Sequence, residues 1–188
     1  MLDLSACVDG ELAALALAGR QSAYGDLLNR HRATVFRIAR HHCGDDDIAL
    51  DLTQQSFVAA FAALNRYDQS RSFPHWLSRI AINKCHDWAR RRKVRRFFSF
   101  ARPLDAAHEL SDPSVAADIQ AADRQELQRT MAAILRLPAK LRDVLVLRTI
   151  EGQSQAEAAA ILDISEKAVE TRLYRAREKL KTLLSANN

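Results

Sequence analysis

The segment that decides the fold is residues 137–184, which read LPAKLRDVLVLRTIEGQSQAEAAAILDISEKAVETRLYRAREKLKTLL. Pro138 suits the first turn of a helix, because its missing N–H would be unpaired there in any case. An apolar stripe follows, and Gly152 is expected to end this helix. Ser154 and Glu157 form a capping box, which predicts the start of a short alanine-rich helix. The segment therefore begins with two successive helices.

The rest of this segment predicts a turn and a second, longer helix. Asp163 suits the tight turn, because a short polar side chain tolerates left-handed backbone angles. Ser165 is expected to cap the following helix. An inward apolar stripe runs along it at spacings of four, three and four, and comprises Val169, Leu173, Ala176 and Leu180. The polar residues on or beside its outer face are Lys167, Glu170, Thr171, Arg172, Tyr174 and Arg175.

A short helix, a tight turn and a polar second helix make the shape that enters a DNA major groove. A charge run alone would more often be the solvated face of a helical bundle. Here the run coincides with two capping signals, a turn and a consistent inward stripe, and the combination favours DNA binding.

The composition predicts an all-helical protein of one or two small domains. The chain has 188 residues, of which 48% are hydrophobic, with only five glycines and four prolines, and strand-like alternation is scarce. The net charge of +5 suits a polyanionic partner. Residues 87–96 carry six basic side chains and one acid, whereas residues 103–120 carry four acids and no Lys or Arg. No apolar run or signal pattern predicts membrane insertion or export, so we expect a cytoplasmic protein.

Metal, cofactor and catalytic sites are not expected. The three cysteines, Cys7, Cys43 and Cys85, are scattered and odd in number, which argues against a disulfide framework. His41 and His42 precede Cys43 and three aspartates, but adjacent helical residues point in different directions and no second cluster lies at ligand spacing. No nucleophile, paired carboxylate or phosphate-binding glycine loop is recognisable, which predicts a protein that is not an enzyme.

Residues 1–96 are predicted to form a first helical domain. Ser22 can cap a long helix that Gly44 ends, and a second helix spans roughly residues 46–64. Its expected core positions are Ile48, Leu52, Val58 and Phe61. A polar segment follows at residues 65–72, and Pro74 then opens a last helix that ends in a basic run. Residues 97–122 are predicted to be an acidic flexible linker, and residues 123–188 form the second domain.

Aromatic and basic side chains are interleaved between the polar segment and the basic run. They are Tyr67, Arg71, Phe73, Trp76, Arg79, Lys84, Trp88, Arg90 and Arg91. Unpaired bases need aromatic platforms and a cationic track for their phosphates. Two ordinary alternatives remain open, because Trp76 and Trp88 could simply fill the core and the arginines could be a solvated helix end.

Joined together, the two domains resemble a known family. DLTQQSFVAAFAALNRYD (51–68) and FPHWLSRIAINKCHDWARRRK (73–93) are similar to the second conserved region of bacterial sigma factors, and residues 137–180 resemble the fourth. Two such regions joined by a short linker resemble the extracytoplasmic-function (group IV) sigma factors of the sigma-70 family. The resemblance implies an all-α fold with a region 2-like bundle and a region 4-like helix-turn-helix domain.

The resemblance also implies roles for individual residues. Contact with the β′ clamp coiled coil of core RNA polymerase is implied for Asp51, Gln54, Gln55 and Phe57. Recognition or melting of the −10 element is implied for Asn65, Arg66, Tyr67, Asp68, Phe73, Trp76, Asn83, Asp87, Arg90 and Arg91. Reading of the −35 element is implied for Lys167, Glu170, Thr171, Arg172 and Arg175.

The expected function is therefore promoter-specific transcription initiation. The implied partners are core RNA polymerase, through its β′ clamp and β flap, promoter DNA and an anti-sigma factor. The main alternative is a self-sufficient helix-turn-helix regulator that acts as a dimer on a palindromic site. A recombinase-like enzyme would need convergent carboxylates, whereas Asp45, Asp46 and Asp47 are consecutive.

Overall fold

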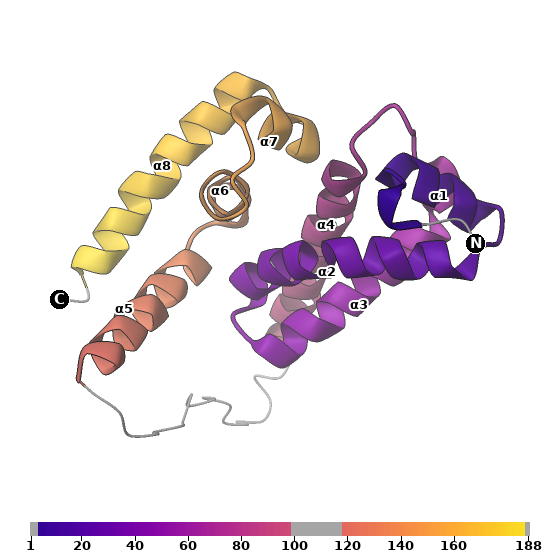
Figure 1. The fold of residues 1–188 in the computed structure, drawn as a ribbon. Coiled ribbons are helices and arrows are strands. Elements are labelled where there is room, and N and C mark those ends of the chain that lie inside the picture. The colour runs from indigo at the N-terminus through magenta and orange to yellow at the C-terminus, as the bar shows by residue number, and fades with distance from the viewer. Residues whose placement is uncertain (1–3, 99–117, 187–188) are drawn as a thin grey trace.

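The structure is a computed structural model that describes residues 4–98 and 118–186. Within these ranges every regular element is helical, which confirms the predicted all-α class. The N-terminal half contains a 3-10 turn at Leu4–Ala6 and the helices α1 (Asp9–Leu17), α2 (Gln21–Cys43), α3 (Asp46–Ala62) and α4 (Phe73–Phe98), with a 3-10 turn at Leu64–Arg66. The C-terminal half contains α5 (Asp118–Leu135), α6 (Ala139–Leu145), a π-helical turn η4 (Val146–Ile150), α7 (Gln155–Leu162) and α8 (Glu166–Ser185). Figure 1 shows the two halves side by side.

The turn between α2 and α3 matches its predicted chemistry. Gly44 adopts a left-handed conformation with φ of 80°, which ends α2. Asp45 then caps α3, because its side chain accepts a hydrogen bond from the Ile48 N–H.

The predicted cap at Ser22 is wrong: α2 begins at Gln21, and the preceding Arg20 provides no side-chain cap. The start of α2 therefore has no side-chain cap.

The core of the N-terminal half lies where α2 packs against α1, α3 and α4. Its largest fully buried side chains include Leu12, Leu27, Ile38, Leu52, Phe73 and Leu77. Val58 was predicted to be a core residue, but it is 69% exposed. Each step along a helix turns by about 100°, so Val58 faces away from the core that its neighbour Phe57 occupies.

The C-terminal half follows its local signals closely. Ser154 accepts a hydrogen bond from the Glu157 N–H, while the Glu157 carboxylate accepts one from the Ser154 N–H. Asp163 is left-handed with φ of 56°, and Ser165 caps α8 by accepting from the Ala168 N–H. These contacts confirm the predicted helix-turn-helix, which pairs α7 with α8.

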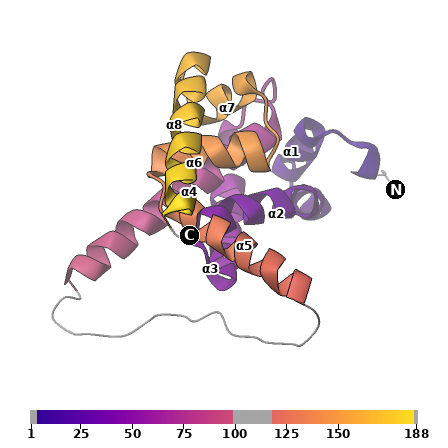
Figure 2. The same ribbon diagram turned by 90° about the vertical axis from the view of Figure 1, so that its left-hand side faces the viewer.

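The two halves are docked on each other. α4 packs against α7, and α2 packs against α5 and η4, as the two views in Figures 1 and 2 show. One apolar cluster runs through both halves, from Leu27 and Leu77 to Val144 and Ile161. Most of the predicted linker, residues 97–122, lies outside the described residues, although α5 already begins at Asp118. Among the helices described, none is long and apolar enough to cross a membrane.

Candidate nucleic-acid and polymerase interfaces

The residues expected to read the −35 element lie on the first three turns of α8. Lys167, Glu170, Thr171 and Arg175 are exposed, and Arg172 is half-buried. Lys167 Nζ donates to Glu170 Oε2 at 2.9 Å, and the Thr171 hydroxyl donates to the Lys167 carbonyl. Val169 and Ala176 are fully buried on the opposite face. The helix therefore presents cations and hydrogen-bonding groups outward from a fixed apolar base, as a recognition helix must.

An aromatic cluster shapes the polar segment before α4. The rings of Tyr67, Phe73 and Trp76 lie 5.1–5.5 Å apart, centroid to centroid. The Tyr67 hydroxyl donates to the Arg71 carbonyl at 2.6 Å, which closes the loop, and burial raises the pKa of this hydroxyl. Phe73 is only 1% exposed and Tyr67 9%. These two rings thus pack inside the domain, while Trp76 remains half-buried at its edge.

Most of the remaining polar residues expected at the −10 element are accessible. Asn65, Arg66 and Asp68 are exposed in the loop. Asp68 accepts from the backbone and hydroxyl of Ser70, and these hydrogen bonds lower the pKa of its carboxyl group. Along α4 the exposed residues are Asn83, Arg90 and Arg91, and Arg90 pairs with the half-buried Asp87. The loop and α4 therefore both expose polar and cationic side chains.

The polymerase-contact residues expected on α3 divide into two groups. Asp51, Gln54 and Gln55 are exposed, and Gln55 donates to Asp51 at 2.7 Å. Phe57 is 3% exposed and belongs to the core. Gln54 and Phe57 border an apolar groove of about 480 Å³ between α2 and α3, together with Leu28, Ala33, Phe36 and Leu50. Leu50 is 54% exposed, so this face combines accessible apolar and polar groups.

A second hollow, of about 340 Å³, lies between the two halves of the chain. Arg79 and Asn83 of α4 line it from one side, and Lys140 of α6 and Arg172 of α8 from the other. At its rim Arg79 pairs with Asp163 of the helix-turn-helix at 3.2 Å. The docked arrangement therefore brings an expected −10 residue and an expected −35 residue into one hollow.

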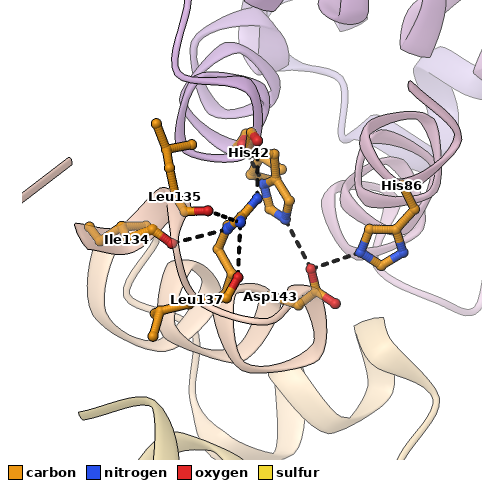
Figure 3. Close-up of polar contacts among 8 residues, drawn as sticks. His42, His86, Ile134, Leu135, Leu137 and Asp143 are labelled. Atoms are coloured by element: carbon orange, nitrogen blue, oxygen red, sulfur yellow. Dashed lines mark hydrogen bonds and ion pairs between the residues drawn. The ribbon is translucent and has the colours of Figure 1, made fainter. Parts of the chain in front are cut away.

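A cluster of buried polar side chains, more enclosed than the hollow, also joins the two halves (Figure 3). Oδ1 of Asp143 in α6 lies 2.9 Å from Nε2 of His42 in α2 and 3.0 Å from Nε2 of His86 in α4. The neighbouring Arg142 donates to the backbone carbonyls of Ile134 and Leu137, at 3.1 and 2.9 Å, and to that of Leu135. It also donates across the interface to the His42 carbonyl at 3.1 Å. At the edge, Arg37 of α2 holds Glu151 through two hydrogen bonds of 3.0 and 2.7 Å.

The electrostatics of this cluster follow from burial and pairing. Burial acts to raise the pKa of Asp143, but the hydrogen bonds from His42 and His86 outweigh it and lower that pKa. The bond to Asp143 raises the pKa of His86. Burial lowers the pKa of Arg142, and it raises the pKa of the nearby Cys85 thiol to about 12. The carboxylate is thus held in its charged form by groups from the other half of the chain.

Sequence reasoning missed this cluster. In the sequence, His42 was considered as a metal ligand only together with its neighbours His41 and Cys43. The structure instead groups His42 with Asp143 and His86, which are 101 and 44 residues away in the chain. The placement of His42 and His86 on amphipathic helices was the one available signal, because a histidine on an inward face needs a buried partner. Nothing in the sequence pairs either histidine with Asp143.

These features define a two-domain, all-helical protein with a helix-turn-helix and an aromatic-basic helix. The profile of the family "Sigma-70 region 2" matches residues 27–95, and that of "Sigma-70, region 4" matches residues 127–180. The chain is 40% identical over 183 residues to the RNA polymerase sigma factor CnrH of Cupriavidus metallidurans, covering 96% of each. It is 30% identical to the ECF sigma factor SigW of Bacillus subtilis, covering 88% of this chain and 91% of that one.

A solved structure of CnrH, in complex with the cytosolic domain of CnrY, superposes with a TM-score of 0.70 at 37% identity. It covers 96% of this chain and 99% of that one. The chain belongs to the extracytoplasmic-function sigma factors of the sigma-70 family. It is a transcription initiation factor that acts with core RNA polymerase at promoters.

Proposed function

We propose that the two halves divide promoter recognition between them, with α8 reading the −35 element and the 65–72 loop and α4 capturing and melting the −10 element. The observation that supports this division most strongly is the accessibility of the α8 cations above a buried Val169 and Ala176. Arg172 and Arg175 suit bidentate contacts with guanine edges, and Lys167 suits phosphate. Glu170 and Thr171 supply an acceptor and a hydroxyl beside them.

The aromatic cluster supports a different kind of site in the N-terminal half. Because Tyr67 and Phe73 are buried, their proposed role is to hold the 65–72 loop in shape rather than to stack on bases. The half-buried Trp76 and the exposed Asn65, Arg66 and Asp68 are then the groups that meet an unpaired base. Asn83, Asp87, Arg90 and Arg91 continue the track along α4.

The polymerase surface is proposed to be the outer face of α3 with the groove beside it. Asp51, Gln54 and Gln55 provide polar contacts, and the exposed Leu50 supplies apolar area that no described part of this chain covers. Phe57 forms the floor of the groove from within the core. Such a mixture of accessible apolar and polar groups is typical of a protein interface. The β flap is the proposed second polymerase contact, on the C-terminal half.

Promoter binding would require the two halves to separate. The −35 and −10 elements lie about 25 base pairs apart, which is about 85 Å of B-form DNA at roughly 3.4 Å per base pair. The docked halves place Arg172 and Asn83 around a single hollow, so one duplex cannot serve both. Core polymerase is the proposed scaffold that holds the halves apart.

The proposed regulator is an anti-sigma factor, because the similar CnrH was solved in complex with the cytosolic domain of CnrY. A partner that covered the α3 face or held the halves together would block polymerase binding. Core RNA polymerase and promoter DNA are in the cytoplasm, so the cytoplasm is also the proposed location of this chain. No bond chemistry is assigned to this chain, since the polymerase performs it.

The decisive experiment combines a pull-down on core polymerase with run-off transcription. We expect the wild-type chain to bind the core enzyme and to start transcripts at a defined position. Gln54→Ala should weaken core binding, whereas Gln128→Ala, an exposed amide on α5, should not. Tight binding of the isolated chain to a palindromic duplex, with no effect of polymerase, would instead favour the dimeric regulator.

A further inference from the structure

The buried cluster between the halves brings together three metal-ligating groups from three helices. His42 comes from the last turn of α2, His86 from the middle of α4 and Asp143 from α6. Nε2 of each histidine and a carboxylate oxygen of Asp143 all lie within 4.8 Å of one another. Figure 3 shows the two imidazole rings approaching the carboxylate from different sides. The side chains of His42 and Asp143 are 3% and 5% exposed, whereas that of His86 is 37% exposed, so the site is buried on one side and accessible on the other.

The hydrogen bonding of His42 directs its Nε2 at the Asp143 carboxylate. Nδ1 of His42 lies 2.7 Å from the Ile38 carbonyl oxygen. That oxygen can only accept, so Nδ1 must carry the hydrogen. In a neutral imidazole Nε2 then carries a lone pair instead of a hydrogen. This lone pair faces Oδ1 of the Asp143 carboxylate, which lies 2.9 Å away. Two lone pairs at this distance need either a second proton on the ring, which makes the hydrogen bond to Asp143 described above, or a metal ion that both atoms bind.

The geometry is close to that of a metal site. Zinc binds imidazole nitrogen and carboxylate oxygen at about 2.0–2.2 Å, so neighbouring ligand atoms of a tetrahedral site lie about 3.3 Å apart. The two nitrogen–oxygen distances, 2.9 and 3.0 Å, are within a few tenths of an ångström of that value. The two nitrogens lie no more than 4.8 Å apart, and the half-buried His86 borders a hollow that leaves its ring room to adjust.

The surroundings of the cluster also suit a metal ion. Ligating histidines usually donate their other ring N–H to a carbonyl or carboxylate, as His42 does to Ile38. Arg142 donates to the carbonyls of Ile134, Leu135, Leu137 and His42, so its guanidinium is directed to backbone groups. The hollow of about 340 Å³ that His86 and Asp143 line gives an ion and its water ligand a path to the site.

We propose that His42, His86 and Asp143 form a binding site for a borderline divalent transition-metal ion such as Zn²⁺, complete only when the two halves are docked. Two imidazoles and a carboxylate are the ligand set that such ions prefer over Mg²⁺ or Ca²⁺. Because Asp143 belongs to one half and both histidines to the other, the ion joins the halves. At a free metal concentration 100 times the Kd, the ratio of docked to separated molecules rises about 100-fold.

Co²⁺ is the probe for the first test, because it occupies zinc sites and absorbs visible light far more strongly in a four-coordinate tetrahedral site than in water. The full-length wild-type chain should bind one Co²⁺ with ligand-field bands that Zn²⁺ abolishes. His86→Gln and Asp143→Asn should each lower the affinity about tenfold or more, a loss at least as large as that seen when supporting groups of metal sites are changed. Circular dichroism of each variant establishes that the helices are intact.

His41→Gln is the matched control. His41 adjoins His42 on α2, and its Nδ1 lies 2.7 Å from the Arg37 carbonyl just as that of His42 does from Ile38. It is not part of the cluster with Asp143, so this variant should bind Co²⁺ as the wild type does. Equal binding by the His86→Gln and wild-type chains, or loss of binding in His41→Gln alone, overturns the proposed site.

Small-angle X-ray scattering gives a second, independent measurement. Zn²⁺ should reduce the radius of gyration of the wild-type and His41→Gln chains, a chelator should reverse this, and the His86→Gln chain should not respond. If the wild-type chain binds neither Co²⁺ nor Zn²⁺ while its compactness still changes with pH, protons alone occupy the cluster and the metal site is refuted. None of these readouts depends on promoter recognition or polymerase.

Discussion

The two halves of the molecule present their functional residues in opposite ways. In α8 the expected DNA-reading side chains stand on the outside of a helix whose buried face is separate from them. In the N-terminal half, Tyr67 and Phe73 belong to the hydrophobic core as well as to the expected DNA-binding loop. The comparison teaches that the surface expected to read a duplex lies apart from the buried face of its helix, whereas the loop expected to receive an unpaired base is held by rings of the core. Substitutions on α8 should therefore change DNA binding without changing stability. Substitutions of Tyr67 or Phe73 should change both DNA binding and stability.

The largest effect is expected from Phe73→Ala. Phe73 is 1% exposed and contacts the rings of His31, Tyr67 and Trp76. Truncating such a residue removes buried apolar area and leaves a cavity, which costs roughly 3–5 kcal/mol. Urea denaturation followed by circular dichroism measures the loss. A variant as stable as the wild type would show that Phe73 is not a core residue and would restore it as a direct base contact.

Arg172→Ala and Arg175→Ala should each weaken −35 recognition by about 1–3 kcal/mol with little change in unfolding free energy. The reason is that neither side chain belongs to the buried stripe of α8. Promoter binding by the holoenzyme, compared on templates with and without the −35 element, measures the effect. A loss of stability as large as that of Phe73→Ala would remove the contrast between the halves.

Trp76→Ala should act at melting instead of at closed-complex formation, because this half-buried ring borders the loop. Permanganate footprinting on duplex and pre-melted promoters separates the two steps. We expect a defect on duplex that a pre-opened bubble largely rescues. Equal impairment on both templates would reduce Trp76 to a folding residue, like Phe73.

Gly44→Ala should destabilise the folded chain by roughly 1–2 kcal/mol through backbone strain, since φ is +80°. A Cβ atom there would also meet Cδ1 of Leu135 of the other half. Gly19→Ala is a useful comparison, because Gly19 has φ of +91° but no neighbouring atom within 4 Å of the added carbon. Scattering should show separation of the halves in Gly44→Ala only. The same compactness in both variants would mean that Leu135 simply moves aside.

The smallest effect concerns Glu157, whose pKa is lowered by hydrogen bonds from the Ser154 backbone and hydroxyl. A carboxylate with a lowered folded-state pKa stabilises above its unfolded value of about 4.3, and the contribution is lost as the pH falls through the folded value. Glu157→Gln should therefore flatten the acid side of the stability profile of the helix-turn-helix. Thermal unfolding between about pH 3 and 6 tests this, and an unchanged profile would show that the capping box does not contribute.

Much of the C-terminal half could be predicted from the sequence because its signals are local. Ser154 with Glu157, Asp163 and Ser165 each act within four residues of the chain, and they recur wherever a helix must start or turn. The same reasoning failed at Ser22 and Val58, where α2 begins without a side-chain cap and α3 turns its outer face to solvent. Long helices are held by packing, and packing is not readable from neighbouring residues.

By itself, the sequence determined the all-α class, the helix-turn-helix and the glycine that ends α2, and its resemblance to sigma factors predicted the residues that meet DNA. Only the tertiary structure decided that Tyr67 and Phe73 are buried, that the halves dock, and that His42 and His86 share one oxygen of Asp143. Those contacts join residues 101 and 57 positions apart. The physical reason is that caps and amphipathic stripes are fixed by steps of three or four residues, whereas a buried polar cluster exists only where separate helices bring its members together.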